Sequence, residues 1–218
     1  MDLQNILSKV DHTLLSVTAT ESDIFTVCED ALNYKTASVC ISPCYVDFAN
    51  KNFGQALNIC TVIGFPNGYN STKVKMFETS DAIENGANEI DMVINIGALK
   101  NKNFDYVASE IKNIKKICGE HILKVIIETC LLTDEEKITM CKIVSNAGAD
   151  YIKTSTGFST GGAILSDIKL FSQNISTNVK IKAAGGISNF EDAQEFITAG
   201  ASRLGTSRLV RLAKQIER

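Results

Sequence analysis

The sequence alternates from one end to the other between short runs rich in β-branched and apolar residues and segments with the spacing of amphipathic helices. Strict alternation of this kind predicts a parallel sheet with helices on its outside. The predicted strands span residues 9–13, 37–41, 57–64, 89–96, 121–128, 150–154, 179–183 and 202–205. The predicted helices span residues 21–33, 45–50, 72–85, 104–118, 134–146, 163–171, 190–198 and 207–217.

Signals at the ends of these segments support the division. The nearly unbroken apolar run NICTVIGF (58–65) is typical of a strand that is covered on both faces. Thr133 with Glu136, and Ser188 with Glu191, fit the capping box that opens a helix. Three helical segments run into NGA, NAGA or AGA, which places glycine where a helix is expected to end.

The number of units favours a closed sheet. Eight strand–helix units in 218 residues leave about 27 residues per unit, close to the minimum for a strand paired with a helix. We expect a single-domain α/β fold, a (β/α)8 (TIM) barrel over residues 1–218. The alternative is an open, doubly wound sheet, which often binds its ligand at a G-x-G-x-x-G turn that this sequence lacks.

Composition excludes several classes of protein. A formal net charge of −3 leaves no large basic face for nucleic acid. The opening residues lack the features of a signal peptide, and no 18-residue apolar window exists, so we expect no membrane span. Seven scattered cysteines without a C-x-x-C pair predict buried thiols in a reducing compartment, and therefore a cytoplasmic protein. The spacing of His12 and His121 predicts no metal site.

Three charged residues lie on predicted strands, where a barrel core would not hold them unpaired. Asp91 lies within EIDMVINIG, Lys153 ends the strand in YIKTSTG, and Lys182 lies within VKIKAAGG. Each residue alone fits a surface position on a frayed strand end. Together they indicate one site, because the strand ends of a barrel converge where barrel enzymes hold their active sites.

Two lysines and a carboxylate favour imine chemistry. Two ammonium groups that are brought together disfavour each other's charge, which lowers the pKa of at least one of them. A lysine that is neutral near pH 7 attacks a carbonyl carbon and forms a Schiff base. A neighbouring carboxylate, with a water molecule, can carry the protons that this reaction moves. The residues alone leave open which lysine attacks.

Glycine-containing turns follow the last three predicted strands, at residues 155–157, 185–186 and 205–207. Glycine allows backbone N–H groups to approach an anion closely. The last two turns precede expected helix N-termini, which favour phosphate. They are either ordinary tight turns or a phosphate site, and their succession at the late strands favours the site.

The strings together resemble the deoxyribose-phosphate aldolase family. YIKTSTGF (151–158) and KAAGGI (182–187), at this spacing, are highly specific. EIDMVINIG, KVIIET and RLGTS, with DHTLL and VCISP near the start, extend the similarity in order from about residue 8 to residue 210. The resemblance implies a class I aldolase that needs no metal or other cofactor. It implies reversible cleavage of 2-deoxy-D-ribose 5-phosphate to D-glyceraldehyde 3-phosphate and acetaldehyde in deoxyribonucleotide catabolism.

The resemblance also implies roles for individual residues. Lys153 corresponds to the Schiff-base nucleophile, Lys182 to a second lysine that perturbs the first and takes part in proton transfer, and Asp91 to a proton donor and acceptor that acts through water. The implied substrate- and phosphate-binding residues are Thr156, Gly157, Gly185, Gly186 and Ser207, with Asp11 and Cys40 as substrate-side neighbours.

Two positions depart from the family's pattern. Phe158 stands where some members have lysine, which removes one positive charge near the phosphate. Arg208 stands where others have a small residue, and it either supplies that charge or points outward along its helix.

Two other functions fit parts of the pattern. One is a Schiff-base barrel lyase that acts on another phosphorylated sugar. The other is a non-catalytic sugar-phosphate-binding regulator, which would not need a close lysine pair. The partners that we expect are a small-molecule sugar phosphate and a second copy of the chain in a homodimer, with no nucleic acid and no membrane.

Overall fold

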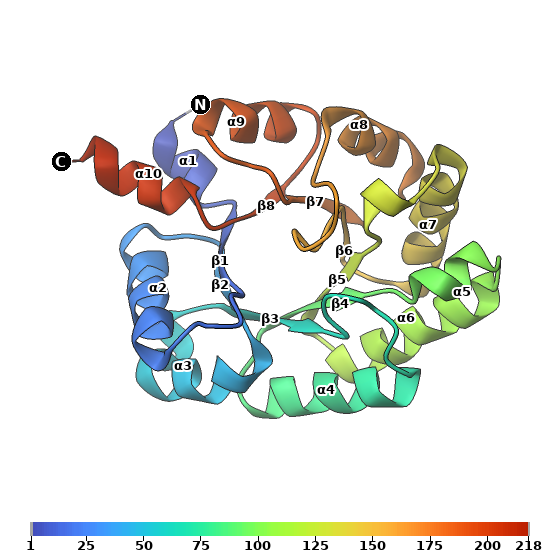
Figure 1. Cartoon of the computed structure of the whole chain (residues 1–218), viewed down its shortest axis with the longest axis horizontal. Helices are drawn as coiled ribbons and strands as arrows, with labels where there is room; N and C mark the ends of the chain where they lie inside the picture. The colour runs from blue at the N-terminus through green and yellow to red at the C-terminus, as the bar shows by residue number, and fades with distance from the viewer. Residues whose placement is uncertain (1, 218) are drawn as a thin grey trace.

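Eight parallel strands close into a barrel in the computed structural model, which describes residues 2–217 (Figure 1). Each strand pairs with the next along the chain, and β8 pairs with β1. This order confirms the predicted (β/α)8 barrel and rules out the open, doubly wound sheet. The strands are β1 (Val10–Leu14), β2 (Ser38–Ile41), β3 (Ile59–Ile63), β4 (Glu89–Val93), β5 (Ile122–Ile126), β6 (Tyr151–Lys153), β7 (Lys180–Ala184) and β8 (Arg203–Thr206).

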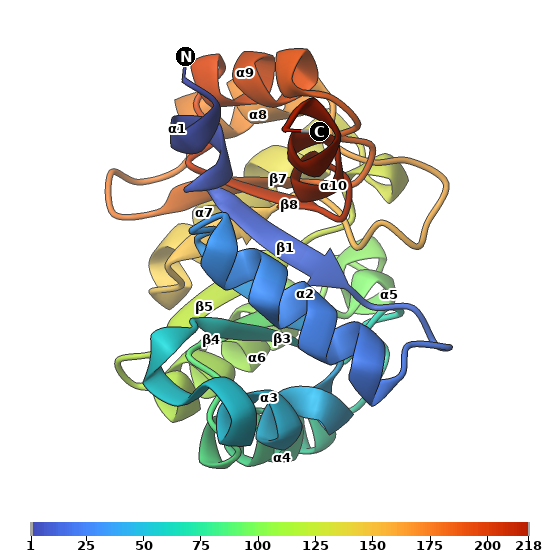
Figure 2. The ribbon, with the colours of Figure 1, turned by 90° about the vertical axis from the view of Figure 1, so that its left-hand side faces the viewer.

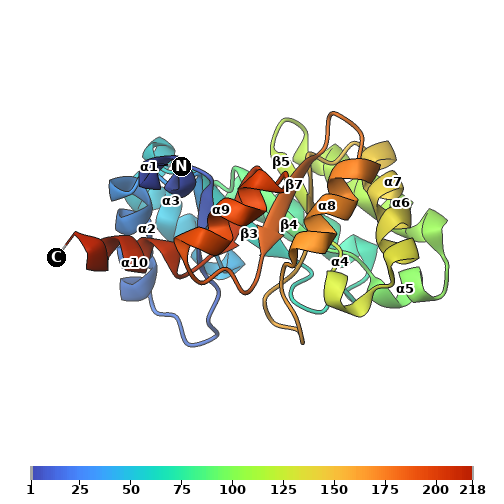
Figure 3. The ribbon, with the colours of Figure 1, turned by 90° about the horizontal axis from the view of Figure 1, so that it is seen from above.

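Helices form an outer ring around the barrel (Figures 1 and 3). Within residues 2–217, no helix has the length and apolar composition needed to cross a bilayer. The α-helices are α1 (Leu3–Leu7), α2 (Glu21–Asn33), α3 (Val46–Phe53), α4 (Thr72–Glu84), α5 (Ile96–Lys100), α6 (Phe104–Cys118), α7 (Asp134–Ala147), α8 (Leu165–Asn174), α9 (Phe190–Thr198) and α10 (Leu209–Ile216). Short 3-10 turns are η1 (Pro43–Tyr45), η2 (Gly54–Ala56) and η3 (Thr129–Leu131).

All predicted strands and helices are present, with most ends displaced by only a few residues. The strand predicted over 89–96 is wrong at its end, because β4 stops at Val93 and Ile96 opens α5. There the Asn95 side chain accepts a hydrogen bond from Ala98 N at 2.9 Å and caps a helical turn. The helices α1 and α5 were not predicted, since five residues are too few for a helical period to be recognised.

Helix ends follow the predicted signals with one exception. The capping box at Thr133 is present, and Gly148 ends α7 with a left-handed φ of +77°. The box predicted at Ser188 is wrong. Asn189 caps α9 instead, because its Oδ1 accepts a hydrogen bond from Asp192 N at 2.7 Å and starts the helix one residue later.

The main apolar core lies between the strands and the helices, and a small separate cluster is formed by Cys40, Cys60 and Val62. Successive strand side chains point to opposite faces of a sheet. In β4, Ile90 and Met92 belong to the apolar layer under the helices. Glu89 and Asp91 face the interior, where they are buried among other charged side chains. Branched apolar residues fill the interior of most such barrels. The charged side chains inside this one therefore indicate a functional site.

The histidine on β1 makes the stability of the fold dependent on pH. His12 is buried, and its Nε2 lies 3.7 Å from Asp30 Oδ2 on α2, which runs alongside β1 in Figure 2. Burial lowers the pKa of His12 from 6.5 to about 4, although Asp30 acts to raise it. The unfolded chain therefore takes up a proton between these two pH values that the folded protein does not.

We expect the free energy of unfolding to fall by about 3 kcal/mol as the pH drops from 7 to 4, because the depressed histidine pKa favours the unfolded chain in that window. In His12→Gln this contribution is absent, so urea denaturation at the two pH values should give a smaller loss than in the wild type. An equal loss in both proteins would show that His12 is not its source.

Candidate active site

Asp91, Lys153 and Lys182 meet inside the barrel, as the convergence of strand ends predicts. Asp91 Oδ2 accepts hydrogen bonds from Lys153 Nζ at 2.7 Å and from Lys182 Nζ at 2.6 Å. The three side chains come from β4, β6 and β7, and all are buried. Because both amines bond to the same oxygen, their nitrogens are no farther apart than the sum of these two lengths. A carboxylate thus lies between the members of a close lysine pair.

Three more charged side chains belong to this cluster, and they were not singled out from the sequence. Lys124 Nζ lies 2.8 Å from Asp91 Oδ1 and 2.5 Å from Glu89 Oε2. Arg203 Nη1 lies 2.9 Å from Glu89 Oε2 and 2.6 Å from Asp11 Oδ1. A signal was available, since the two-residue period of a strand places Glu89 on the same inward face as Asp91. Lys124 pairs with Asp91 in the register of β4 and β5.

Asp11 connects Lys182 to Arg203. Its Oδ2 accepts a hydrogen bond from Lys182 Nζ, and its Oδ1 accepts one from Ser38 Oγ at 2.8 Å as well as the contact from Arg203. Asp11 and Cys40, which the resemblance places beside the substrate, are both buried and do not line the cavity described below. In this structure Asp11 therefore acts on its charged neighbours, at a distance from the cavity.

The contacts of the cluster favour the ionised forms of Asp91 and Lys182. Burial alone would raise the pKa of Asp91, but Lys124, Lys153 and Lys182 outweigh it and hold that pKa well below its usual range. Burial would lower the pKa of Lys182, but Asp11 and Asp91 outweigh it and raise that pKa above its usual value. Repulsion between the two lysines therefore does not lower the pKa of Lys182, because carboxylates lie beside its amine.

Sulfur and carboxylate donors also come together here, at sequence spacings that did not predict a site. One donor atom from each of Cys40, Cys60 and Asp91 lies within 4.8 Å of the others. However, Lys124 Nζ lies 3.2 Å from Cys60 Sγ and 2.8 Å from Asp91 Oδ1. Burial acts to lower the pKa of Lys124, but Asp91 and its other anionic neighbours raise it well above its usual value. The Lys124 ammonium group thus already contacts two of the three residues that a metal ion would use as ligands.

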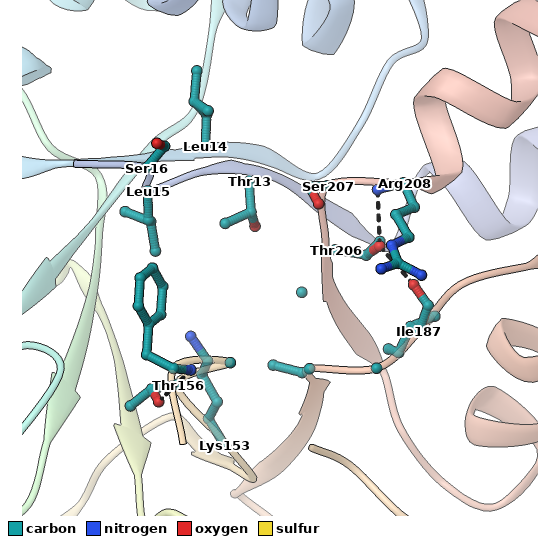
Figure 4. A pocket seen from close by; sticks show the side chains of 16 residues that line it. Thr13, Leu14, Leu15, Ser16, Lys153, Thr156, Ile187, Thr206, Ser207 and Arg208 are labelled. Carbon is teal, nitrogen blue, oxygen red and sulfur yellow. Dashed lines mark hydrogen bonds between the residues drawn. The ribbon is translucent and has the colours of Figure 1, made fainter. Parts of the chain in front are cut away.

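A cavity of about 430 Å³ opens beside Lys153 (Figure 4). Lys153 reaches its wall from β6, whereas Lys124 and Lys182 do not line it. All five residues that were predicted to bind phosphate line this cavity: Thr156, Gly157, Gly185, Gly186 and Ser207.

Four of these five residues present unused backbone donors. Within residues 2–217, the N–H groups of Gly157, Gly185, Gly186 and Ser207 make no hydrogen bond to the protein. The three glycines have φ values of +84°, +82° and +81°, a backbone conformation that suits glycine. Several free amide donors on one cavity wall are an arrangement that suits an anion.

Thr156 differs from the other four residues because its donors bind a side chain of the protein. Its N–H donates to Glu128 Oε1 at 3.2 Å, and its Oγ1 donates to Glu128 Oε2 at 2.5 Å. Both donors are therefore occupied, and Thr156 fastens the loop after β6. Glu128 was missed because it reads as the end of an apolar run. It is buried and has a left-handed φ of +55°, a conformation that costs on the order of 1 kcal/mol or more outside glycine.

The two departures from the family's pattern both lie at the cavity. Arg208 lines it, beside Thr206 and Ile187 in Figure 4, and this favours the first of its two alternatives. The Arg208 N–H donates to Thr206 Oγ1 at 3.1 Å. Phe158 adds an apolar wall instead of a charge, and its ring meets Phe65 edge to face at 5.2 Å.

The free amides predict a measurable anion affinity. A Cβ on Gly185 would lie 3.0 Å from Gly162 Cα at a φ of +82°, so Gly185→Ala must distort the turn. We expect at least about tenfold weaker binding of inorganic phosphate, measured as the phosphate-dependent rise in Tm. Gly148→Ala, at a φ of +77° with open space around it, matches the backbone strain away from the cavity and should keep the rise. An undiminished rise in Gly185→Ala would contradict the assignment.

Comparison with known proteins relates this site to a family. The family model of the DeoC/LacD aldolases matches residues 6–207. The chain is 58% identical to a deoxyribose-phosphate aldolase of Clostridium botulinum, over 98% of this chain and 97% of the relative. It is 56% identical to one of Streptococcus agalactiae, over 98% and 96%. The solved deoxyribose phosphate aldolase of Aeropyrum pernix superposes with a TM-score of 0.91 at 30% identity, over 99% of this chain and 92% of that one. The chain belongs to the DeoC/LacD family of aldolases.

Proposed function

We propose that this aldolase reversibly cleaves 2-deoxy-D-ribose 5-phosphate to D-glyceraldehyde 3-phosphate and acetaldehyde, through a Schiff base on Lys153. One observation carries the proposal. Lys153 is the member of the buried charge cluster that lines the cavity, and the same cavity carries the free amides of an anion site. A small molecule that carries an aldehyde and a phosphate could place the aldehyde at Lys153 and the phosphate at the free amides. The names of the relatives from Clostridium botulinum and Streptococcus agalactiae support this substrate.

The reaction begins at the open-chain aldehyde. The free amine of Lys153 adds to the aldehyde carbon, and the oxygen leaves as water to give an iminium ion. The iminium accepts the electron pair of the C2–C3 bond when the C3 hydroxyl loses its proton. D-glyceraldehyde 3-phosphate then departs and leaves an enamine. Protonation of the enamine carbon and hydrolysis of the resulting imine release acetaldehyde and restore the amine.

Asp91 and Lys182 carry the protons in this proposal. Asp91 Oδ2 is 2.7 Å from Lys153 Nζ and 2.6 Å from Lys182 Nζ, so one oxygen accepts from the reacting amine and from its neighbour. A water molecule at the cavity would connect this oxygen to the substrate. The depressed pKa of Asp91, which its lysine neighbours maintain against burial, keeps the carboxylate available as an acceptor at neutral pH.

The phosphate supplies orientation from a part of the substrate that does not react. In this proposal, the free amides of Gly157, Gly185, Gly186 and Ser207 hold it, and the Arg208 guanidinium adds a positive charge on the same wall. Thr156 contributes by keeping the loop after β6 in place through Glu128. Asp11 contributes through Lys182. No separate observation assigns a role to Cys40.

We also propose that residues 1–218 act as one domain, without a metal or other cofactor, as a cytoplasmic homodimer in deoxyribonucleotide catabolism. Exposed apolar side chains on α4, at Val74 and Phe77, support contact with a second copy. Seven free cysteines support a reducing compartment. The relative from Aeropyrum pernix is described as a tetramer, which is a property of that protein.

Borohydride reduction in the presence of deoxyribose 5-phosphate tests the proposal. The wild type should gain one reduced adduct, which peptide mass mapping places on Lys153. Lys153→Ala should form none and should lose about 10³-fold or more in turnover, because the nucleophile is absent. Lys112→Ala removes an exposed lysine and should behave as the wild type.

Three outcomes would contradict this assignment. An adduct on Lys182 would move the nucleophile, and faster turnover of a ketose phosphate would favour another Schiff-base lyase. Tight binding of sugar phosphates without any trapped adduct would favour a regulator.

A second prediction concerns Arg208. Arg208→Met should raise KM for deoxyribose 5-phosphate about tenfold and leave kcat/KM for unphosphorylated 2-deoxyribose unchanged, because a charged hydrogen-bond donor to the phosphate is lost. Arg211→Met, an exposed residue of α10, is the matched control and should change neither value. Equal losses on both substrates would mean that Arg208 supports the fold of the cavity and not the phosphate.

A further inference from the structure

The buried charges of the barrel form a closed ring of alternating sign. In order, it runs Asp91, Lys124, Glu89, Arg203, Asp11, Lys182 and back to Asp91, with every neighbouring pair in contact. Three carboxylates and three cations balance within it. Lys153 is attached to the ring at Asp91 alone and is the seventh charged group.

We propose that Glu89 and Arg203, at the end of the barrel away from the cavity, are positioning residues that set the pH at which Lys153 becomes reactive. This inference rests on the proposed function, because it concerns the amine that forms the Schiff base. Neither residue lines the cavity, so neither can touch the substrate. Each is the first residue of its strand, β8 for Arg203 and β4 for Glu89.

Two chains of contacts connect Glu89 and Arg203 to Asp91, the residue that binds Lys153. Glu89 reaches Asp91 through Lys124, whose Nζ contacts both carboxylates at 2.5 and 2.8 Å. Arg203 reaches Lys182 through Asp11, whose two oxygens are divided between them. The Arg203 guanidinium also lies over the Tyr151 ring, 5.5 Å from its centroid. The two routes meet again at Asp91, where Lys124 contacts Oδ1 and Lys182 contacts Oδ2, the oxygen that also binds Lys153.

Packing alone does not account for these residues. Buried ion pairs lose most of their attraction to the cost of desolvation, and apolar residues of similar volume often stabilise a protein as well or better. Here Glu89 and Arg203 are 2% and 9% exposed and complete the neutrality of the ring. Charge is felt over longer distances in a buried interior than in water, so their removal acts on Lys153 without any displacement of atoms.

The sign of each effect follows from the charge count. Arg203→Met leaves the ring with one excess negative charge, which favours the ammonium form of Lys153. Glu89→Gln leaves one excess positive charge, which favours the free amine. The double variant is neutral again. The other titratable or charged groups of the ring, its contacts and the adjoining cavity are unchanged in all three variants: Asp91, Lys124, Lys182, Asp11, Cys40, Cys60, Tyr151, Glu128 and Arg208.

The experiment measures trapping of acetaldehyde by cyanoborohydride as a function of pH, with intact mass as the readout. We expect the pH at half-maximal rate to rise by about one unit in Arg203→Met and to fall by about one unit in Glu89→Gln. The double variant should return to within about 0.3 units of the wild type, as restored neutrality requires. The reducing agent has the same pH dependence for every protein, so the differences between proteins isolate the lysine.

Glu110→Gln is the matched control. Glu110 is a fully buried partner of Lys75 at 2.9 Å, but it joins α4 and α6 outside the barrel. It should lower Tm and leave the pH of half-maximal trapping in place. If Arg203→Met does not fold, the isosteric Glu89→Gln decides the question alone, since its profile must move downward.

Shifts of the same sign in both single variants, or reduced rates without a shift, would overturn the proposal and leave a structural role. Failure of the proposed function looks different. In that case the wild type itself would not be trapped at Lys153.

Discussion

The shared carboxylate of Asp91 is the contact on which the interior of this barrel depends. Three lysine nitrogens, from β5, β6 and β7, lie within 2.8 Å of its two oxygens. Without it, three ammonium groups would face one another in a space from which water is excluded. Breaking a buried ion pair by removing one partner typically costs about 3–5 kcal/mol. Asp91 thereby holds together strands that the chain separates widely and keeps the Lys153 amine at the cavity.

The residues that form the apolar core and the charged residues of the site lie on opposite faces of the strands. Apolar side chains on the outward faces of the strands pack under the helices and form the core. The inward faces carry charges that a core of ordinary composition would exclude. A neutral ring makes these charges tolerable, because each carboxylate has a cation on either side. Loops that follow β6, β7 and β8 then add the anion site at the one end of the barrel where Lys153 is accessible.

Much of this architecture could be predicted from the sequence. The alternation of strands and helices predicts the barrel, and the convergence of strand ends predicts that Asp91, Lys153 and Lys182 meet. The charge ring could not be predicted in the same way, because Lys124 and Glu89 lie inside runs that read as apolar core. Without those partners in view, the sequence indicates only that the two lysines repel each other and lower the pKa of at least one of them. The carboxylates that reverse its effect on Lys182 become visible only in three dimensions.

The loops were the least predictable part. Thr156 fits a phosphate-binding string, yet its donors are taken by Glu128, a residue from the preceding strand–helix unit. The orientation of Arg208 was also undecided by sequence, since a residue at the start of a helix can point along the axis or toward a neighbouring turn. Both outcomes depend on contacts between segments that are distant in the chain, and local pattern carries no information about them.

Neutron diffraction at neutral pH tests the central claim most directly, because it locates the exchangeable hydrogens of the ring. The account predicts three deuterons on Nζ of Lys124 and of Lys182, and none on the carboxylates of Asp11 and Asp91. A deuteron on either carboxylate, or a neutral Lys182, would contradict it, since the ring would then be held by neutral hydrogen bonds instead of alternating charge.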